Sequence, residues 1–231
     1  MAGSDRFRRL RRALTWFVLA CAAAVTALAG TAQAAPVTTA STAVEGALDR
    51  LVSDGVPGAI ATVRDGERRW HAAAGVADLE TQEPISAGDR FRIGSIAKSY
   101  LSTVVLQLAA ERRLRLDDSV QRWLPGLVPN GEAISVRQLL NHTSGLPDYV
   151  DLPFYVQLLE EPLTTYRPRE LVQRAVAQPP LFAPGTGWSY SNTTYVLLGL
   201  IVAAANKVPA SLQTAAPALE VYRRIVVPLR L

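Results

Sequence analysis

One stretch of seventeen residues, 94–110, carries a single charge and constrains the fold more than any other part of the chain. Ile, Leu, Val and Ala fill most of the remaining positions, and the one charge is Lys98. The run predicts a long helix, from about Ser95 to Arg113, that is apolar on nearly all sides and therefore buried. Such a helix needs a protein interior around it, so we expect a folded domain with one sizeable core.

The start of this helix pairs a serine with the lysine. Ser95 lies three residues before Lys98, so both side chains share one helical face. Burial of the lysine would favour its neutral amine, which can take the proton of a serine hydroxyl. The helix start adds free N–H groups and a partial positive charge, which suit an oxyanion. In the competing interpretation, Ser95 only caps the helix and Lys98 extends to the surface.

A second group of polar residues follows a turn at 184–187. Tyr190 and Asn192 stand two positions apart, just before a helix predicted at 193–206. A phenol there can relay a proton, and an amide can hold a substrate carbonyl group or the lysine. The alternative is that Tyr190 is a core aromatic residue and Asn192 caps the helix.

The first 34 residues have the pattern of an export signal. Five arginines precede an apolar run at 13–30, and Ala32-Gln33-Ala34 has the small-x-small form of a cleavage site. We therefore expect a secreted protein cleaved near Ala34, rather than a membrane anchor or a lipoprotein modified at Cys21. Those arginines account for the formal charge of +4, because acidic and basic residues balance in the remainder. Nucleic acid is therefore not an expected partner.

The composition also excludes some architectures. One Cys and two His residues rule out a disulfide scaffold and a zinc site built from Cys and His. Residues 35–43 are expected to be a polar linker before a globular part at 44–231. A helix is predicted at 42–53, and two strands at 59–63 and 69–75 form a hairpin around an Asp-Gly turn. Further helices are predicted at 118–124, 136–142, 169–178, 193–206 and 219–227, with no further strand.

Four blocks of the sequence resemble the superfamily of serine β-lactamases and D-alanyl-D-alanine carboxypeptidases, with class C β-lactamases and secreted carboxypeptidases the most similar. The blocks are residues 91–98, 114–125, 136–147 and Tyr190-Ser191-Asn192. The resemblance implies an α/β (α+β) fold of the β-lactamase and DD-peptidase type and an acyl-enzyme mechanism without metal or cofactor. In that family Ser95 would be the acylated nucleophile, Lys98 its base, Tyr190 a second proton relay and Asn192 a ligand to the substrate amide.

The resemblance also implies a class of substrate and an oligomeric state. The expected substrate is a peptidoglycan stem peptide or a β-lactam, and the protein is expected to be a monomer. Two other functions stay open: a small-ester esterase, and a weakly active or inactive remnant that binds penicillin. His142 falls in a block that the family uses structurally, to hold a loop by hydrogen bonds, and His71 is expected to pack on its strand.

The sequence departs from the family pattern towards its end. The third family motif, His or Lys followed by Thr or Ser and then Gly on a strand, is not found at the expected place. We expect a partial domain that lacks the C-terminal strands, and hence low stability and weak activity, because half of the oxyanion hole would be lost. Pro209 and Pro217 are also expected to break helix in an unusually long segment before residue 221.

Overall fold

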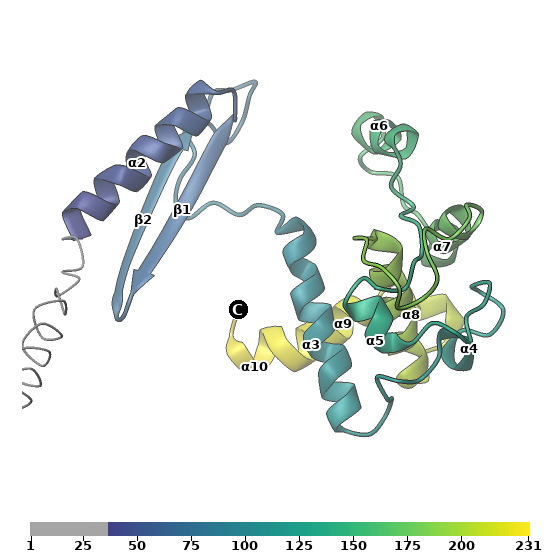
Figure 1. The fold of residues 1–231 in the computed structure, drawn as a ribbon. Helices are drawn as coiled ribbons and strands as arrows, with labels where there is room; N and C mark the ends of the chain where they lie inside the picture. The colour runs from purple at the N-terminus through teal and green to yellow at the C-terminus, as the bar shows by residue number, and fades with distance from the viewer. Residues whose placement is uncertain (1–36) are drawn as a thin grey trace, which may run out of the picture. The chain divides into compact units, whose positions relative to one another are not determined.

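The computed structural model describes residues 37–231, which form two compact units that divide between Phe91 and Arg92 (Figure 1). The expected export signal, residues 1–34, lies outside the described residues. Within the described part of the chain, no helix combines the length and the apolar character needed to cross a membrane.

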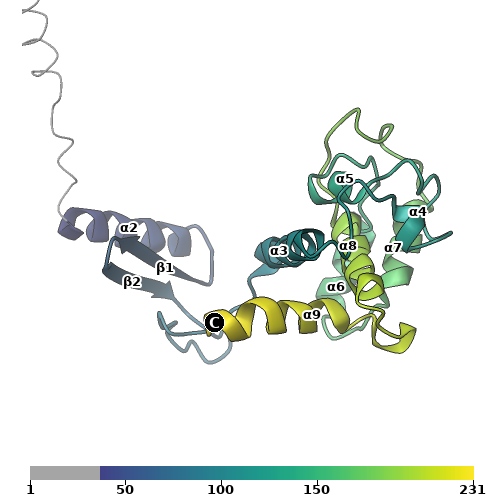
Figure 2. The same cartoon turned by 90° about the horizontal axis from the view of Figure 1, so that it is seen from below.

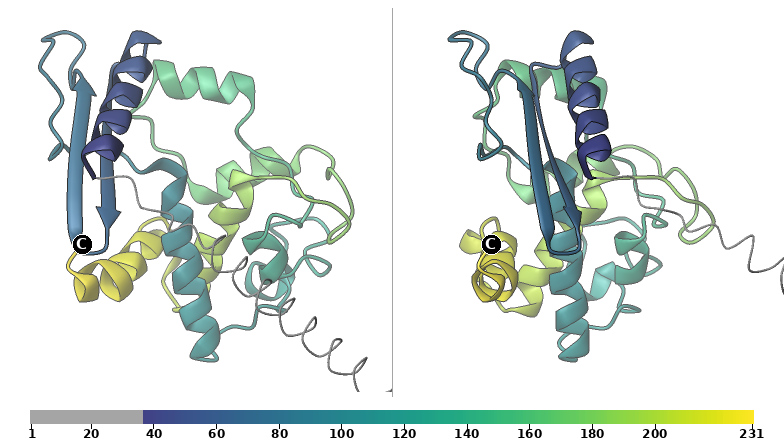
Figure 3. Two further views of the ribbon diagram at one scale, coloured as in Figure 1. Left: turned by 60° about the vertical axis from the view of Figure 1, so that its left-hand side comes forward. Right: turned by 90° about the vertical axis from the view of Figure 1, so that its left-hand side faces the viewer.

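The first unit is a β-hairpin with one helix against it. β1 (Gly58–Asp65) and β2 (Arg68–Gly75) pair antiparallel along their whole length, which confirms the predicted hairpin. The turn contains Gly66 at a φ of +57°, a conformation that glycine adopts at little cost. The helix α2 (Val37–Ser53) lies on one face of the hairpin, and its Leu48 is buried (Figure 3).

Two details of this unit differ from expectation. The helix α2 begins five residues earlier than predicted, so most of the expected linker at 35–43 is helical. No proline or glycine interrupts residues 37–45, and adding turns to an existing helix costs little once it has nucleated. His71 is exposed rather than packed, and its Nδ1 lies 3.0 Å from the Oγ1 of Thr62 on the neighbouring strand.

The second unit is helical. Its helices are α3 (Ala97–Ala110), α4 (Val120–Trp123), α5 (Val136–Leu140), α6 (Leu152–Glu160), α7 (Pro168–Val176), α8 (Asn192–Ala205), α9 (Ala216–Val221) and α10 (Val227–Leu229). Short 3-10 turns occupy Gly94–Ile96 and Ala210–Leu212, and a π-helical turn, Tyr222–Val226, joins α9 to α10. Among residues 37–231, the strands are the two of the hairpin, as predicted.

The helix α8 forms the centre of this unit's core. Every residue from 197 to 203 is buried, and α3, α5, α7 and α9 all pack against α8 (Figure 2). Burial of each large aliphatic side chain contributes about 1.5–3 kcal/mol. The start of α8 is therefore a firm base for any side chain placed there.

The long apolar helix predicted from the sequence is α3, but it is buried on one side only. Val104, Val105 and Leu108 are fully buried, whereas Ile96 is 63% exposed and Leu106 51% exposed. The sequence of α8 is also apolar on all sides. Which of these two helices is enclosed depends on the elements that pack against each, and here it is α8.

The C-terminal segment starts α9 where a break was expected. Pro217 occupies the first turn of α9, where its missing N–H would have no helical partner, so the predicted break there is wrong. Arg224, in the π-helical turn, donates to Glu220 over 2.6 Å and to Glu111, just after α3, over 2.5 Å. This ion-pair network ties the C-terminal helices to α3.

The helix α6 was not predicted. Asp151 accepts the N–H of Phe154 at 2.9 Å and so caps its start, and Pro153 lies in its first turn. An acidic cap followed by proline is a helix-start signal that the sequence does contain. Asp151 also accepts from Arg174 of α7 at 2.7 Å.

Candidate active site

Hydrogen bonds connect the four residues predicted to form a reactive site. The Oγ of Ser95 is 2.9 Å from the hydroxyl oxygen of Tyr190. Lys98 Nζ donates a hydrogen bond to the same Oγ over 3.2 Å. Lys98 also donates to Asn192 Oδ1 over 2.7 Å, and the Tyr190 hydroxyl donates to the same oxygen over 3.4 Å. Two segments far apart in the sequence thus form one hydrogen-bonded cluster.

The start of α3 places Ser95 and Lys98. Gly94 has a φ of +52°, in the left-handed region that glycine adopts readily, and the 3-10 turn that it begins leads into α3. The first N–H groups of a helix have no partner within that helix. The N–H of Ser95 is therefore suited to donate a hydrogen bond to an oxyanion that forms next to the nucleophile's own Oγ.

Lys98 is half-buried, not enclosed as the sequence predicts. Its Nζ is held by two hydrogen bonds, to Ser95 and Asn192, and lies 5.1 Å from the ring centre of Tyr190. A cation above an aromatic face is attracted by the ring's negative face. Specific contacts, more than burial, therefore hold this amine in place.

The other half of the cluster comes from the segment that enters α8. Ser191 occupies the N-cap position, and Asn192 is the first residue of the helix. The alternative that Asn192 caps the helix is therefore wrong, because its side chain faces Lys98. Tyr190 is 41% exposed, so it is not a core aromatic residue either.

The surroundings of Tyr190 shift its acidity. Partial burial raises the pKa of its hydroxyl, but hydrogen bonds from Lys98 and Ser95, together with the positive charge of Lys98, outweigh this effect and lower the pKa below 10.0. A phenol with a lowered pKa releases its proton more readily near neutral pH. Tyr190 is thereby suited to exchange a proton with Ser95.

Buried hydroxyl groups fasten this segment to the loop formed by residues 142–149. Ser191 Oγ and Thr193 Oγ1 both donate to the carbonyl oxygen of Pro147, over 3.0 and 2.8 Å. In return, the N–H of Tyr149 donates to Thr193 Oγ1 over 3.0 Å. Because Ser191 and Thr193 are buried, breaking the bonds of their hydroxyl groups would leave polar groups unsatisfied. The 142–149 loop is thus held firmly beside the start of α8.

His142 contacts Tyr190 rather than Ser95. The two ring centres are 4.6 Å apart, and the Nδ1 of His142 accepts the N–H of Ser191 at 3.3 Å. Desolvation lowers the pKa of His142 below its ordinary 6.5, and the charge of Lys98 lowers it further. A neutral imidazole is what the bond from Ser191 requires, since Nδ1 must be an acceptor.

Asp148 belongs to the cluster, although the sequence did not single it out. Its Oδ2 accepts a hydrogen bond from Asn192 Nδ2 at 2.7 Å. It directly follows the block at 136–147 that carries the family resemblance, and this position was the only signal that could have drawn attention to it. The cluster therefore extends from Ser95 through Lys98 and Asn192 to a carboxylate.

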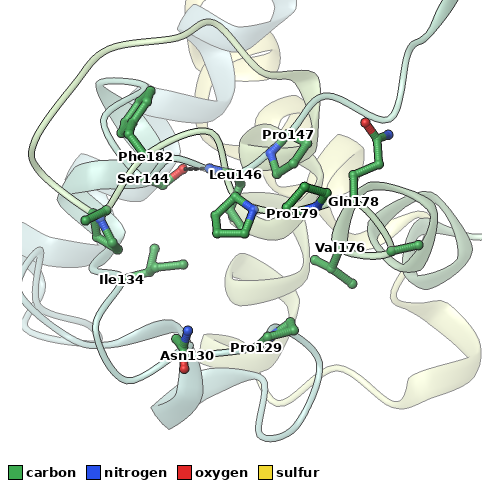
Figure 4. Close-up of a pocket in the computed structure, with 14 residues that line it drawn as sticks. Pro129, Asn130, Ile134, Ser144, Leu146, Pro147, Val176, Gln178, Pro179 and Phe182 are labelled. Carbon is green, nitrogen blue, oxygen red and sulfur yellow. Dashed lines mark hydrogen bonds between the residues drawn. The ribbon is translucent and has the colours of Figure 1, made fainter.

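A separate cavity of about 690 Å³ borders the 142–149 loop (Figure 4). Ser144, Leu146 and Pro147 line it together with the proline-rich segment 179–184. Its lining contains none of the clustered residues and no charged side chain. Residues 37–231 also contain no group of three His, Cys, Asp or Glu side chains that could hold a metal ion.

Comparison with known proteins identifies the family. The Beta-lactamase family model matches residues 39–214. Among solved structures, a D-stereospecific amidohydrolase from Streptomyces sp. is 42% identical with a TM-score of 0.72, and the match covers 82% of this chain and 54% of that one.

Curated relatives point to the same family. A penicillin-binding protein of Bacillus subtilis is 31% identical over 63% of this chain and 32% of its own length. Esterase EstB of Burkholderia gladioli is 34% identical over 66% of this chain and 42% of its own length. The chain thus spans about half of the matched amidohydrolase and less of these relatives. It has a β-lactamase-like fold and belongs to the Beta-lactamase family, whose members are serine hydrolases.

Proposed function

We propose that the protein is a secreted serine hydrolase that cleaves amide bonds of D-amino acids, as a D-alanyl-D-alanine carboxypeptidase or a related D-amidase, through an acyl-enzyme on Ser95. The observation that carries the proposal is the pair of hydrogen bonds that Ser95 Oγ makes with Tyr190 and Lys98. A serine hydroxyl becomes a useful nucleophile only when a neighbouring group removes its proton. The similarity to a D-stereospecific amidohydrolase and the expected export signal support this choice of substrate.

The proposed reaction has two stages, acylation and deacylation of Ser95. Tyr190, as the phenolate beside the positive charge of Lys98, takes the proton of Ser95 while Oγ attacks the substrate carbonyl carbon. The N–H of Ser95 stabilises the oxyanion that develops. The C–N bond then breaks, and the same proton passes to the leaving amine. Water then loses a proton to the same group and attacks the ester carbon. The acyl C–O bond breaks, and the proton passes to Oγ, which regenerates Ser95 and releases the acid. Proton transfer of this kind contributes about 10²–10⁴ in rate.

The test uses a chromogenic anilide and a covalent label. The purified protein should release nitroaniline from D-phenylalanine p-nitroanilide in preference to the L isomer, and a fluorescent penicillin should label it at Ser95, located by peptide mass. Ser95→Ala should abolish both without changing the melting temperature, because the Ser95 side chain is exposed. Release that persists in Ser95→Ala would show that another residue is the nucleophile.

Ester hydrolysis is the second candidate, because one curated relative is an esterase. Comparing p-nitrophenyl acetate with the D-anilide separates the two functions by their kcat/KM ratio. Stoichiometric labelling by penicillin without turnover of either substrate would instead support a penicillin-binding role without catalysis.

A further inference from the structure

The inference starts from the amide of Asn192, which lies between a cation and an anion. Its Oδ1 accepts from Lys98 at 2.7 Å, and its Nδ2 donates to Asp148 Oδ2 at 2.7 Å. We propose that Asp148 is a positioning residue for the reaction at Ser95, which holds the amide of Asn192 in the one orientation that presents its oxygen to Lys98. This inference rests on the proposed acylation of Ser95.

The orientation argument depends on what each neighbour can accept or donate. An ionised carboxylate only accepts hydrogen bonds, and an ammonium group only donates them. With the amide reversed, its oxygen would face Asp148 and its NH₂ group would face Lys98, so both contacts would become repulsive. The carboxylate thus excludes the reversed amide, and Asn192 is ready to bind the lysine before any substrate arrives.

Asp148 can do this because its own position is fixed. Its Oδ1 accepts the N–H of Val150 at 3.1 Å, which leaves Oδ2 directed at Asn192. The residues on either side are anchored as well, since Pro147 accepts two buried hydroxyl groups and Tyr149 donates to Thr193. The carboxylate of Asp148 is therefore held in place by the hydrogen bonds of its two neighbours to the start of α8.

The charge of Asp148 is directed at the cluster. Among the described residues, no ion pair within 4.0 Å joins Asp148 to an arginine or lysine, although nine pairs involve other carboxylates. The amide of Asn192 is thus the group that links this carboxylate to Lys98. A polarised amide oxygen is a stronger acceptor, so it holds Nζ more firmly beside Ser95.

The experiment exchanges the two side chains. Asp148→Asn should slow acylation by a fluorescent penicillin about tenfold, because the amide of Asn192 can then adopt either orientation. Asn192→Asp should slow it about a hundredfold, because two carboxylates would face each other. In the double variant the new amide can donate to the new carboxylate, which still accepts from Lys98. Acylation should therefore recover at least about tenfold over Asn192→Asp.

Asp151→Asn is the matched control. Asp151 lies three positions along the chain, caps α6 and pairs with Arg174, and its carboxylate makes no hydrogen bond to the cluster formed by Ser95, Lys98, Tyr190, Asn192 and Asp148. This change should lower the melting temperature and leave the acylation rate unchanged. A role of Asp148 in loop stability alone would give the same result for both aspartates, and no recovery in the double variant.

Two results would overturn the inference. One is acylation by Asp148→Asn at the rate of Asp151→Asn, and the other is a double variant no faster than Asn192→Asp. If the wild-type protein is not acylated at all, the proposed function fails. The melting temperatures of the wild type, Asp148→Asn, Asn192→Asp and the double variant then test the contact on which the inference depends. Non-additive shifts support the contact between residues 148 and 192, and additive shifts refute it.

Discussion

Removing the hydroxyl of Tyr190 should slow acylation far more than it destabilises the protein. In the structure this hydroxyl contacts Ser95 at 2.9 Å and Asn192 at 3.4 Å. Loss of a positioned proton relay costs about 10²–10⁴ in rate, which is about 2.7–5.4 kcal/mol in the activation barrier. The side chain is 41% exposed, so water replaces the lost bonds, and Tyr190→Phe should lower the free energy of unfolding by less than about 1 kcal/mol.

Tyr195→Phe is the matched control with the opposite expectation. The hydroxyl of Tyr195 lies 2.9 Å from Ser102 Oγ in α3 and donates to the carbonyl oxygen of Leu140 in α5 over 3.1 Å. These contacts join three helices and are partly buried, so the free energy of unfolding should fall by about 1–3 kcal/mol. The ring remains, and Ser95 keeps all its partners, so acylation should stay near the wild-type rate.

The assay measures the rate of labelling by a fluorescent penicillin across pH, together with urea unfolding of each variant. Since the pKa of Tyr190 is lowered, the wild-type rate should rise as the pH approaches that pKa and the phenolate forms. The variant Tyr190→Phe should lose this rise. Equal acylation by Tyr190→Phe and the wild type would refute the role of the phenol, as would a large rate loss in Tyr195→Phe at unchanged stability.

Three further predictions concern the scaffold of the site. Gly145 has a φ of +75°, and an added Cβ would lie 2.1 Å from the carbonyl oxygen of Phe182. The matched control is Gly126→Ala, where φ is +73° and the added Cβ meets no atom within 4 Å, so only the backbone strain of about 1–2 kcal/mol remains. Gly145→Ala should therefore unfold at a lower urea concentration than Gly126→Ala. Leu197→Ala should lower the free energy of unfolding by about 2–5 kcal/mol, because Leu197 is fully buried in α8, and urea titration measures the change. Desolvation lowers the pKa of His142 in the folded protein, so the unfolded chain binds a proton at this residue more readily. The free energy of unfolding should therefore fall as the pH drops from 6.5, the ordinary pKa of histidine, through the lower pKa of the folded state. His142→Asn, which tolerates the φ of +62° at this position, should remove that dependence of the urea midpoint, and an unchanged pH profile would contradict it.

Local signals explain which parts of the fold could be predicted. The Asp65-Gly66 turn between two strand-like runs predicted the hairpin correctly, because turn chemistry and strand pattern agree there. The start of α2 was wrong by five residues because helix propagation through Thr and Ser leaves little trace in the sequence. The burial of α3 was also misjudged, since its enclosure depends on which elements pack against it.

The spacing of the site residues was more informative than their burial. The spacing of Ser95 and Lys98 predicted that they share a helix face. Tyr190 and Asn192 were predicted to lie just before the helix at 193–206, which is α8 in the structure. What the sequence could not provide was the contact between these two pairs. That contact depends on how α3 packs against α8, which is a long-range property of the core.

Asp148 and Asp151 show where prediction from the sequence ends. Both are aspartates between α5 and α6, and both follow the same family-like block, so residue type and spacing do not distinguish them. In the structure one accepts from Asn192 and the other from Arg174, because the bonds to Pro147 fix how the loop lies against the start of α8. The same chemical change, aspartate to asparagine, should therefore affect catalysis at position 148 and stability at position 151.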